Sequence, residues 1–244
     1  MQSVALTDCG QVRQMNQDNI FICDQRIGPL PNLYIVADGM GGEKAGDVAS
    51  AELVKRMCDH IENSKERPLI ALNEAILHAN KEIFSMAKTN KDFQGMGTTL
   101  VTATYILGEL LVANVGDSRL YLLDHSKINQ VTVDHSYVEE MVRLGKFSRD
   151  SKEYQEKKNI ITRAVGASEV LEIDYFKLIP KKGNIALLCS DGLSNMVSDE
   201  RILDIVNLSD SLEKAARELV KTANDNGGKD NISVILLSGM GEEK

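Results

Sequence analysis

Short runs of apolar and β-branched residues, bounded by polar residues or glycine, recur along the chain and predict β-strands. These runs lie at 20–23, 33–37, 99–106, 110–115, 120–123, 185–189 and 232–237. None approaches the roughly 20 consecutive apolar residues that a membrane-spanning helix needs. The pattern therefore favours a protein built on buried sheets, with no membrane partner.

Longer segments between the strands place apolar residues three and four positions apart, as a helix with one buried face requires. This spacing predicts a helical pair over 49–61 and 69–87 and a later helix over 212–223. We expect the last helix to end at Gly227 and Gly228, because glycine readily adopts the left-handed conformation that closes a helix.

The middle of the chain combines a helix start with a polar excursion. Ser136 and Glu139 have the spacing of a capping box, which predicts a helix beginning after Ser136. The residues that follow, 145–159, have only Phe147 and Tyr154 as large apolar side chains. Because such a segment buries little surface, we expect a mobile excursion on the surface of the protein.

The order of these elements indicates the fold class. Helices interrupt groups of strands without the regular alternation that a doubly wound parallel sheet requires, so we expect an α+β fold of mainly antiparallel sheets covered by helices. The 244 residues contain no linker rich in proline, glycine or serine. A single domain over 1–244 follows as the expectation.

Composition and charge exclude several classes of function. The net charge of −8, with only isolated pairs of lysines, argues against a nucleic-acid partner, which would need clustered basic residues. The four cysteines show no CxxC spacing, which indicates reduced and mostly buried thiols. The chain begins without a signal-peptide pattern, so we expect a cytoplasmic protein.

Acidic residues recur beside glycine at the ends of the predicted strands. The acids in question are Asp38, Asp117, Asp191 and Asp230. Each one alone is explained by a turn, since aspartate and glycine are both common turn residues. Four aspartates at strand ends are better explained together if those strand ends converge in space.

Converging carboxylates would need a cation, because like charges a few ångströms apart repel and raise one another's pKa. All-oxygen ligation suits Mg²⁺ or Mn²⁺ rather than zinc. Zinc is further disfavoured because the histidines form no HExxH motif and no pairing with cysteine at ligand spacing. His60 and His78 are interpreted as packing or surface residues, and His135 as local structure beside the capping box.

Other catalytic signatures are absent from the sequence. It contains no GxSxG motif and no phosphate-binding P-loop. Near the N-terminus, Arg13 precedes Asp18 by five residues. A guanidinium group suits phosphate recognition, and an acid beside it can hold water on a metal, although this pair is weak evidence by itself.

Eight motifs in order resemble the metal-dependent Ser/Thr protein phosphatases of type 2C, in their bacterial form. The motifs are TDCGQVRQMNQD, VADGMGGEKAG, GMGTTLV, ANVGDSRLYL, TVDHSYVEEMVRLG, ITRAVG, LLCSDGLSNMV and DNISVILL. They extend over roughly residues 7–237. The resemblance implies a four-layer αββα sandwich, with two antiparallel sheets between helices and a centre of two Mn²⁺ or Mg²⁺ ions in a cleft at one end.

The resemblance also implies roles for individual residues. Asp38 would bridge the two metals and the carbonyl of Gly39 would bind one of them. Asp191 and Asp230 would hold the other metal.

Further roles follow from the other motifs. Arg13 would bind the substrate phosphate, Asp18 would bind the centre through water, and Asp117 would help to hold a third, weaker metal together with the Asp191 carboxylate. Residues 145–160 fall where the family carries its flap, which we expect to influence substrate choice. Met40 replaces a histidine that is the proposed general acid in many eukaryotic members, so metal-bound water is the expected proton donor.

The implied function is a Mn²⁺- or Mg²⁺-dependent phosphoserine/phosphothreonine protein phosphatase. A metal-activated water would attack the phosphomonoester directly, and the enzyme would oppose a bacterial Ser/Thr kinase and act on that kinase's substrates as a monomer. Two alternatives stay open: a phosphatase for small phosphoesters or for an anti-sigma-type regulator, and an inactive relative that binds phosphoproteins. The second is disfavoured because Asp38, Asp191 and Asp230 are all present.

Overall fold

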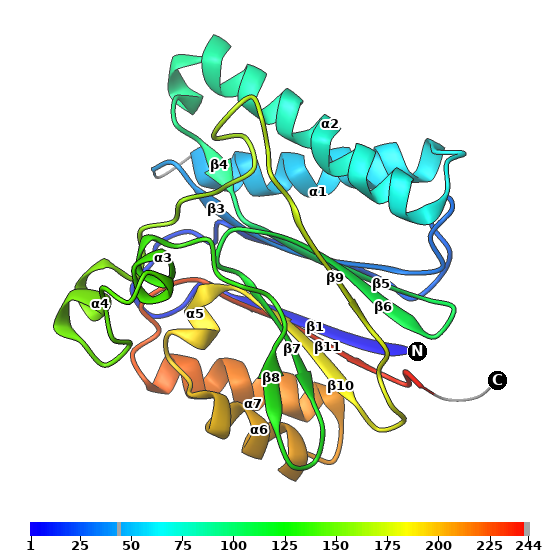
Figure 1. Ribbon diagram of the computed structural model, residues 1–244, viewed down its shortest axis with the longest axis vertical. Helices are drawn as coiled ribbons and strands as arrows, with labels where there is room; N and C mark the ends of the chain where they lie inside the picture. The colour runs from blue at the N-terminus through cyan, green and yellow to red at the C-terminus, as the bar shows by residue number, and fades with distance from the viewer. Residues whose placement is uncertain (43–44, 242–244) are drawn as a thin grey trace.

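The protein is a sandwich of four layers in the computed structural model, which describes residues 1–42 and 45–241 (Figure 1). Two sheets pack face to face, and helices cover the outer face of each, so the expected αββα architecture is confirmed. The helices are α1 (Ala45–Asn63), α2 (Pro68–Thr89), α3 (Tyr137–Arg143), α4 (Lys152–Lys157), α5 (Asp191–Ser194), α6 (Asp199–Leu208) and α7 (Leu212–Asp225).

The strands form two sheets whose paired neighbours are all antiparallel. One sheet has the order β1-β11-β10-β7-β8, and the other has the order β2-β3-β5-β6-β9, with β4 paired to β3. The strands are β1 (Gln2–Asp8), β2 (Asp18–Cys23), β3 (Leu33–Met40), β4 (Gly97–Thr98), β5 (Leu100–Ile106), β6 (Glu109–Val115), β7 (Arg119–Leu123), β8 (Ile128–Gln130), β9 (Asp174–Leu178), β10 (Ile185–Cys189) and β11 (Ile232–Ser238).

Three apolar layers hold the sandwich together. The helices α1 and α2 pack on the six-stranded sheet, and α6 and α7 pack on the five-stranded sheet. The layer between the sheets is formed by residues such as Tyr34, Val101 and Ile235, all fully buried. Strands covered on both faces need side chains that are apolar on both faces, which explains the almost continuous apolar sequence of β10 and β11.

Several elements differ from the sequence-based expectation. The strands β1 and β9 were not expected, because they are half-exposed and mix polar with apolar positions. The helix α6 was not expected either. Strand β3 continues to Met40 instead of ending at residue 37, because β4 pairs with its last residues.

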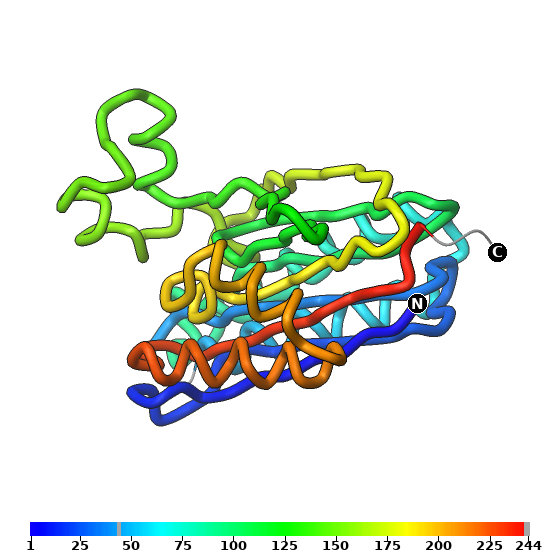
Figure 2. Tube along the Cα trace, turned by 90° about the horizontal axis from the view of Figure 1, so that it is seen from below, coloured from blue at the N-terminus to red at the C-terminus, as the bar shows by residue number. Residues whose placement is uncertain are grey.

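The polar segment after α3 contains a short helix, α4, and projects from the body of the molecule (Figure 2). Its place on the surface agrees with the expectation for 145–159, while its mobility stays a prediction. The expectation for the thiols was partly wrong: all four cysteines are free, but only Cys189 is buried. Among the residues described, no helix has the length and apolar character that crossing a membrane would require.

Candidate metal centre

Acidic residues from both sheets converge at one end of the sandwich. A cavity of about 400 Å³ opens there. It is lined by Arg13, Gln17, Asp38, Gly39, Met40, Gly41, Gly42, Thr99, Asp117, Asn159, Ile161, Asp191, Asp230 and Asn231. Asp18 is buried at this same end, opposite Asp38 in the register of β2 and β3. The structure thus brings together every residue that the sequence marks as a candidate ligand or phosphate contact.

The backbone of Asp38 is fixed by two threonines of the neighbouring chain. The Asp38 amide donates to Thr99 Oγ1 at 2.9 Å, and the Asp38 carbonyl accepts from the Thr99 amide at 2.8 Å and from Thr98 Oγ1 at 2.9 Å. The side chain of Asp38 therefore projects from a strand end whose backbone amide and carbonyl are both hydrogen-bonded. A carboxylate on such a fixed backbone has little freedom to turn away from the neighbouring acids.

Close packing, not a turn, explains the glycines that follow two of the acids. Neither Gly39 nor Gly192 has a positive φ. A Cβ at Gly39 would lie 2.0 Å from the carbonyl oxygen of Gly46, and a Cβ at Gly192 would lie 1.9 Å from that of Asn231. In both places a second segment of backbone approaches so closely that only glycine fits. The turn interpretation of these Asp-Gly pairs is therefore wrong, since Gly39 lies in β3 and Gly192 in α5.

Asp18 is held by one carboxylate oxygen only. Ser190 Oγ donates to Asp18 Oδ2 at 2.7 Å, whereas Asp18 Oδ1 is buried and has no hydrogen-bond partner. Burial raises the pKa of Asp18 to about 7, and the charges of Asp191 and Asp230 act in the same direction. A buried oxygen without a donor is unfavourable and suits a cation or its water.

Asp191, the first residue of α5 beyond β10, shows the same pattern. The side-chain amide of Asn195 donates to Asp191 Oδ2 at 2.9 Å, while Asp191 Oδ1 is buried without a partner. Burial and then the charge of Asp230 raise the pKa of Asp191 to about 6. One oxygen of each of these two acids, Asp18 and Asp191, is thus positioned by the protein, and the other is suited to a cation.

The N-terminal loop that carries Arg13 is anchored by Asn231. The Asn231 side-chain amide donates to the carbonyls of Cys9 and Met15 at 2.9 and 3.0 Å, and its oxygen accepts from the Gln17 amide at 2.8 Å. Arg13 Nη2 donates to Asp230 Oδ2 at 2.7 Å, with the arginine side chain 49% exposed. The guanidinium therefore lies at the rim of the acidic cluster and stays accessible from solvent.

Asp117 lies in the turn between β6 and β7. Burial raises its pKa to about 8, followed by the charges of Asp191 and Asp134. The adjacent Ser118 Oγ lies 2.7 Å from Thr99 Oγ1, the same hydroxyl that accepts the amide of Asp38. This hydroxyl contact connects the Asp117 turn directly to the strand end that carries the Asp38 side chain.

The electrostatics of the cluster fit a divalent cation. The pKa of Asp38 lies well above its ordinary value because the group is buried and because Asp18, Asp191, Asp117 and Asp230 all repel its charge. In the described part of the chain, no three or more His, Cys, Asp or Glu side chains are arranged so that they could hold a metal ion by themselves. Backbone carbonyls and water would have to complete the coordination shell, which is the donor set that Mg²⁺ and Mn²⁺ accept.

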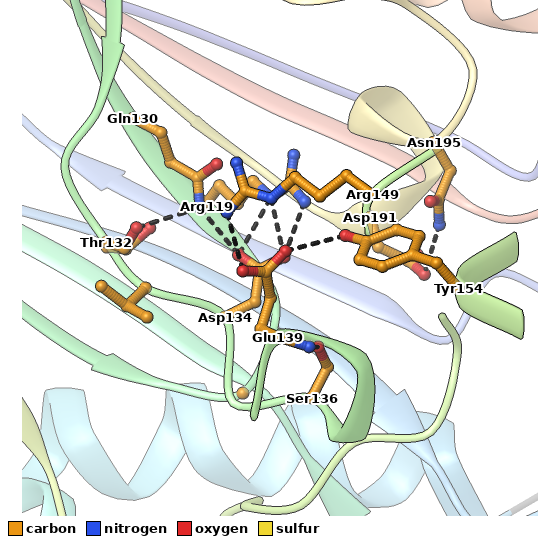
Figure 3. A network of polar contacts seen from close by, with 12 residues as sticks. Arg119, Gln130, Thr132, Asp134, Ser136, Glu139, Arg149, Tyr154, Asp191 and Asn195 are labelled. Carbon is orange, nitrogen blue, oxygen red and sulfur yellow. Dashed lines mark hydrogen bonds and ion pairs between the residues drawn. The ribbon is translucent and has the colours of Figure 1, made fainter. Parts of the chain in front are cut away.

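A second polar network lies beside the centre and reaches the flap (residues 145–160). Figure 3 shows Arg119 facing Asp134, and the ion pair is mostly buried, with Arg119 Nη2 2.6 Å from Asp134 Oδ2. Further out, the carboxylate of Glu139 accepts hydrogen bonds from Arg149 Nη2 and Tyr154 Oη, each at 2.8 Å. These contacts hold α4 against α3 next to the cavity.

The same network corrects one expectation at Ser136. Its hydroxyl accepts the hydrogen bond of the Glu139 amide at 3.3 Å and so caps α3 as predicted. The Glu139 carboxylate, however, does not complete a capping box, because it binds Arg149 and Tyr154 of the flap. The spacing predicted the helix correctly and the partner of the glutamate incorrectly.

Four residues with a supporting role were missed by the sequence analysis: Thr99, Ser190, Asn195 and Asn231. Each lies within or beside a recognised motif, so proximity to a predicted acid was the available signal. Their partners were not predictable, because Ser190 and Asp18, for example, are 172 positions apart in the chain.

Comparisons with known proteins identify relatives of the whole chain. The family described as Protein phosphatase 2C matches residues 3–232. The serine/threonine phosphatase stp of Listeria welshimeri is 39% identical over 236 residues, covering 95% of this chain and 93% of that protein. The protein phosphatase PhpP of Streptococcus pneumoniae is 36% identical over 247 residues, covering 100% and 99%.

Solved structures give the same result. The crystal structure of the serine/threonine phosphatase Stp1 from Staphylococcus aureus superposes with a TM-score of 0.90 at 31% identity, covering 97% of this chain and 94% of that one. The serine/threonine phosphatase PstP/Ppp of Mycobacterium tuberculosis gives a TM-score of 0.85 at 32% identity, covering 96% and 97%.

Proposed function

Because the chain belongs to the protein phosphatase 2C family and is a serine/threonine protein phosphatase, we propose that its centre is built by Asp38, Gly39, Asp191 and Asp230 around two Mn²⁺ or Mg²⁺ ions. The family is metal-dependent. The single observation that carries the assignment to these residues is that Asp38, Asp191 and Asp230 converge on one cavity, where burial and then neighbouring carboxylates raise the pKa of Asp38 and of Asp191. Such a cluster is unfavourable without a cation and is well suited to one.

The role proposed for each metal-binding residue follows from its position in the site. Asp38, whose backbone amide and carbonyl are both hydrogen-bonded, would be shared by the two ions, and the Gly39 carbonyl would bind one of them. Asp191 and Asp230 would hold the other ion, and Asp18 would act through water from its buried Oδ1 atom. When bound, a pair of such ions lowers the pKa of a shared water, orients it for in-line attack and neutralises the phosphoryl oxygens.

The residues around the ions bind and orient the substrate. Arg13 presents a half-exposed guanidinium at the rim of the cavity, where its planar donors suit a phosphate. Met40 also lines the cavity and has no proton to give. The leaving serine or threonine oxygen therefore takes its proton from water and not from the side chain at position 40. Asp117, which lines the cavity together with Asp191, would contribute to a third and weaker cation site.

The biological setting is proposed on the same basis. We propose that the enzyme acts in the cytoplasm as a monomer. It would counteract a Ser/Thr kinase by hydrolysing the phosphoproteins that the kinase produces. The four free cysteines fit a reducing compartment. The flap, bound to α3 through Glu139, stands beside the cavity and is the proposed determinant of substrate choice.

The test uses purified Asp38→Ala and Asp191→Ala with a phosphothreonine peptide and Mn²⁺. Both variants should lose hydrolysis by at least about 100-fold, a figure typical of losing a catalytic electrostatic contact. Asp59→Ala, at an exposed position of α1, is the matched control and should keep full activity. Wild-type activity should disappear in EDTA and return with Mn²⁺, and wild-type rates in either cluster variant would refute the assignment.

A substrate comparison separates the protein phosphatase from the alternative for small esters. The values of kcat/KM for a phosphothreonine peptide and for a small aryl phosphate should differ in favour of the peptide. Equal or reversed values would support the alternative.

A further inference from the structure

His135 is a buried histidine that the proposed centre does not use. Its side chain is 8% exposed and lies between the turn that carries Asp117 and strand β9. Sequence alone assigned it to local structure beside Ser136. Its contacts give it a more specific place in the molecule.

Two hydrogen bonds join His135 to Gly116, the residue immediately before Asp117. The Gly116 amide donates to His135 Nδ1 at 3.0 Å, and the His135 amide donates to the Gly116 carbonyl at 2.9 Å. Gly116 has a φ of +104°, and a Cβ there would lie 2.7 Å from Thr99 Cγ2. The peptide before Asp117 is therefore held by His135 and packed tightly against Thr99.

The other ring nitrogen is also occupied, and this fixes the tautomer. Since Nδ1 accepts a hydrogen bond, the neutral ring carries its proton on Nε2. Nε2 lies 3.2 Å from Asp174 Oδ2, which accepts that proton's hydrogen bond. Arg163 Nη1 donates to Asp174 Oδ1 at 2.8 Å, and its 3.0 Å contact with His135 Nε2 is not a hydrogen bond in this tautomer, because both nitrogens are then donors. Burial lowers the pKa of His135, which favours the neutral ring that this arrangement requires.

The backbone of His135 forms the neck of the flap-bearing segment. Its carbonyl accepts the Thr162 amide at 2.7 Å, and the next residue, Ser136, is bridged to Ile161. The chain leaves the sandwich at Ser136 and returns at Ile161, which itself lines the catalytic cavity. His135 therefore contacts the Asp117 turn with its ring and the chain returning from the flap, at Thr162, with its backbone.

We infer that His135 is a positioning residue for Asp117: by accepting the hydrogen bond of the Gly116 amide, it fixes the direction in which the Asp117 carboxylate enters the cavity and couples that direction to the flap neck. The inference rests on the proposed role of Asp117 in a third, weaker cation site. It gives a reason for a buried histidine that does not itself line the cavity. Loss of a residue that orients a ligand typically weakens metal affinity about 10- to 100-fold.

Titration of metal-free protein with Mn²⁺ by calorimetry tests the inference without any substrate. His135→Leu removes the acceptor at similar volume and should weaken the weaker Mn²⁺ binding step by about 10-fold or more, with the tighter step unchanged. His135→Asn places an oxygen close to the position of Nδ1 and should bind Mn²⁺ like the wild type. His125→Leu, the same change in an exposed turn, is the matched control and should have no effect.

Asp117→Asn separates failure of the inference from failure of the proposed function. It should abolish the weaker step. If it does so while His135→Leu binds Mn²⁺ normally, the role of His135 is wrong and the ligand role of Asp117 stands. If Asp117→Asn leaves both steps unchanged, the ligand role fails and the inference falls with it.

Kinetics supply a second readout that a purely structural role would not give. At subsaturating Mn²⁺, His135→Leu should lower kcat for a phosphothreonine peptide with little change in KM, and tenfold more Mn²⁺ should restore it. If the leucine variant does not fold, His135→Gln carries the same test, because its amide reaches toward Nε2 and leaves Nδ1 empty. A loss that extra Mn²⁺ does not recover in a folded variant would refute the inference.

Discussion

The substitution Asp18→Asn should stabilise the metal-free protein and destabilise the metal-loaded one. Asp18 is 5% exposed, and Oδ1 has no donor, so its charge is unfavourable in the empty site. An asparagine keeps the oxygen that accepts from Ser190 and replaces the unpartnered oxygen by an amide, which can donate to the neighbouring carboxylates. The sign of the effect therefore depends on whether a cation is present.

The magnitude follows from the pKa of Asp18, which burial raises from 3.8 to about 7. A folded-state pKa above the unfolded value means that stability is complete below pH 3.8 and is lost as the pH rises through 7. The shift of about 3 units corresponds to a loss of up to about 4 kcal/mol, shared with the acids around it. For a chain of this size the asparagine variant should gain up to roughly 10 °C in Tm at pH 8, and less at pH 5.

Thermal unfolding in EDTA and in Mn²⁺ at pH 5, 6.5 and 8 measures this effect. In EDTA the difference between variant and wild type should grow with pH, and in Mn²⁺ the wild type should gain more Tm than the variant does. Asp59→Asn, at an exposed position of α1, should match the wild type throughout. A variant no more stable than the wild type in EDTA at pH 8, or a gain independent of pH, would show that burial and repulsion do not set the pKa of this group.

Three further outcomes are expected. Gly39→Ala should unfold at a lower temperature and lose activity, because its Cβ would lie 2.0 Å from a backbone oxygen of α1; wild-type activity and Tm would contradict the close-packing account. Arg119→Met should cost about 3–5 kcal/mol in chemical denaturation by leaving the buried Asp134 unpaired, and a second change, Asp134→Leu, should recover part of it; additive losses would refute the pairing. Tyr154→Phe removes the hydrogen bond to Glu139 and should raise KM for a phosphopeptide while sparing a small aryl phosphate; equal effects on both substrates would argue against the flap as a specificity element.

The sequence was most informative where a strand is buried on both faces. The runs at 185–189 and 232–237 correspond closely to β10 and β11, because a short, continuous apolar run is typical of a strand covered on both sides. Strands β1 and β9 have one exposed face and short, mixed sequences, so their identity depends on partners far away in the chain. The helix α6 was missed although Ser198 caps it and Ile202, Ile205 and Val206 have helical spacing.

The residues of the candidate site were predicted from sequence motifs, whereas the physical role of the glycines beside them is visible only in the structure. Asp38 and Asp191 were identified from their positions beside glycine, but the glycines serve close backbone contacts with Gly46 and Asn231. Such contacts join segments that the sequence separates, and no local pattern encodes them. The same holds for His135, whose ring binds an amide 19 positions away.

The position of β11 has a consequence for the order in which the protein matures. β11 lies between β1 and β10 in its sheet, yet it is the last strand of the described chain to be synthesised. Until it emerges, β1 has no partner and the five-stranded sheet is split, with its β10 edge exposed. Asp230 directly precedes this strand, so the same event closes the sheet and supplies the last acid of the cluster. A chain that stops before β11 therefore lacks both a central strand of this sheet and the last acid that lines the cavity.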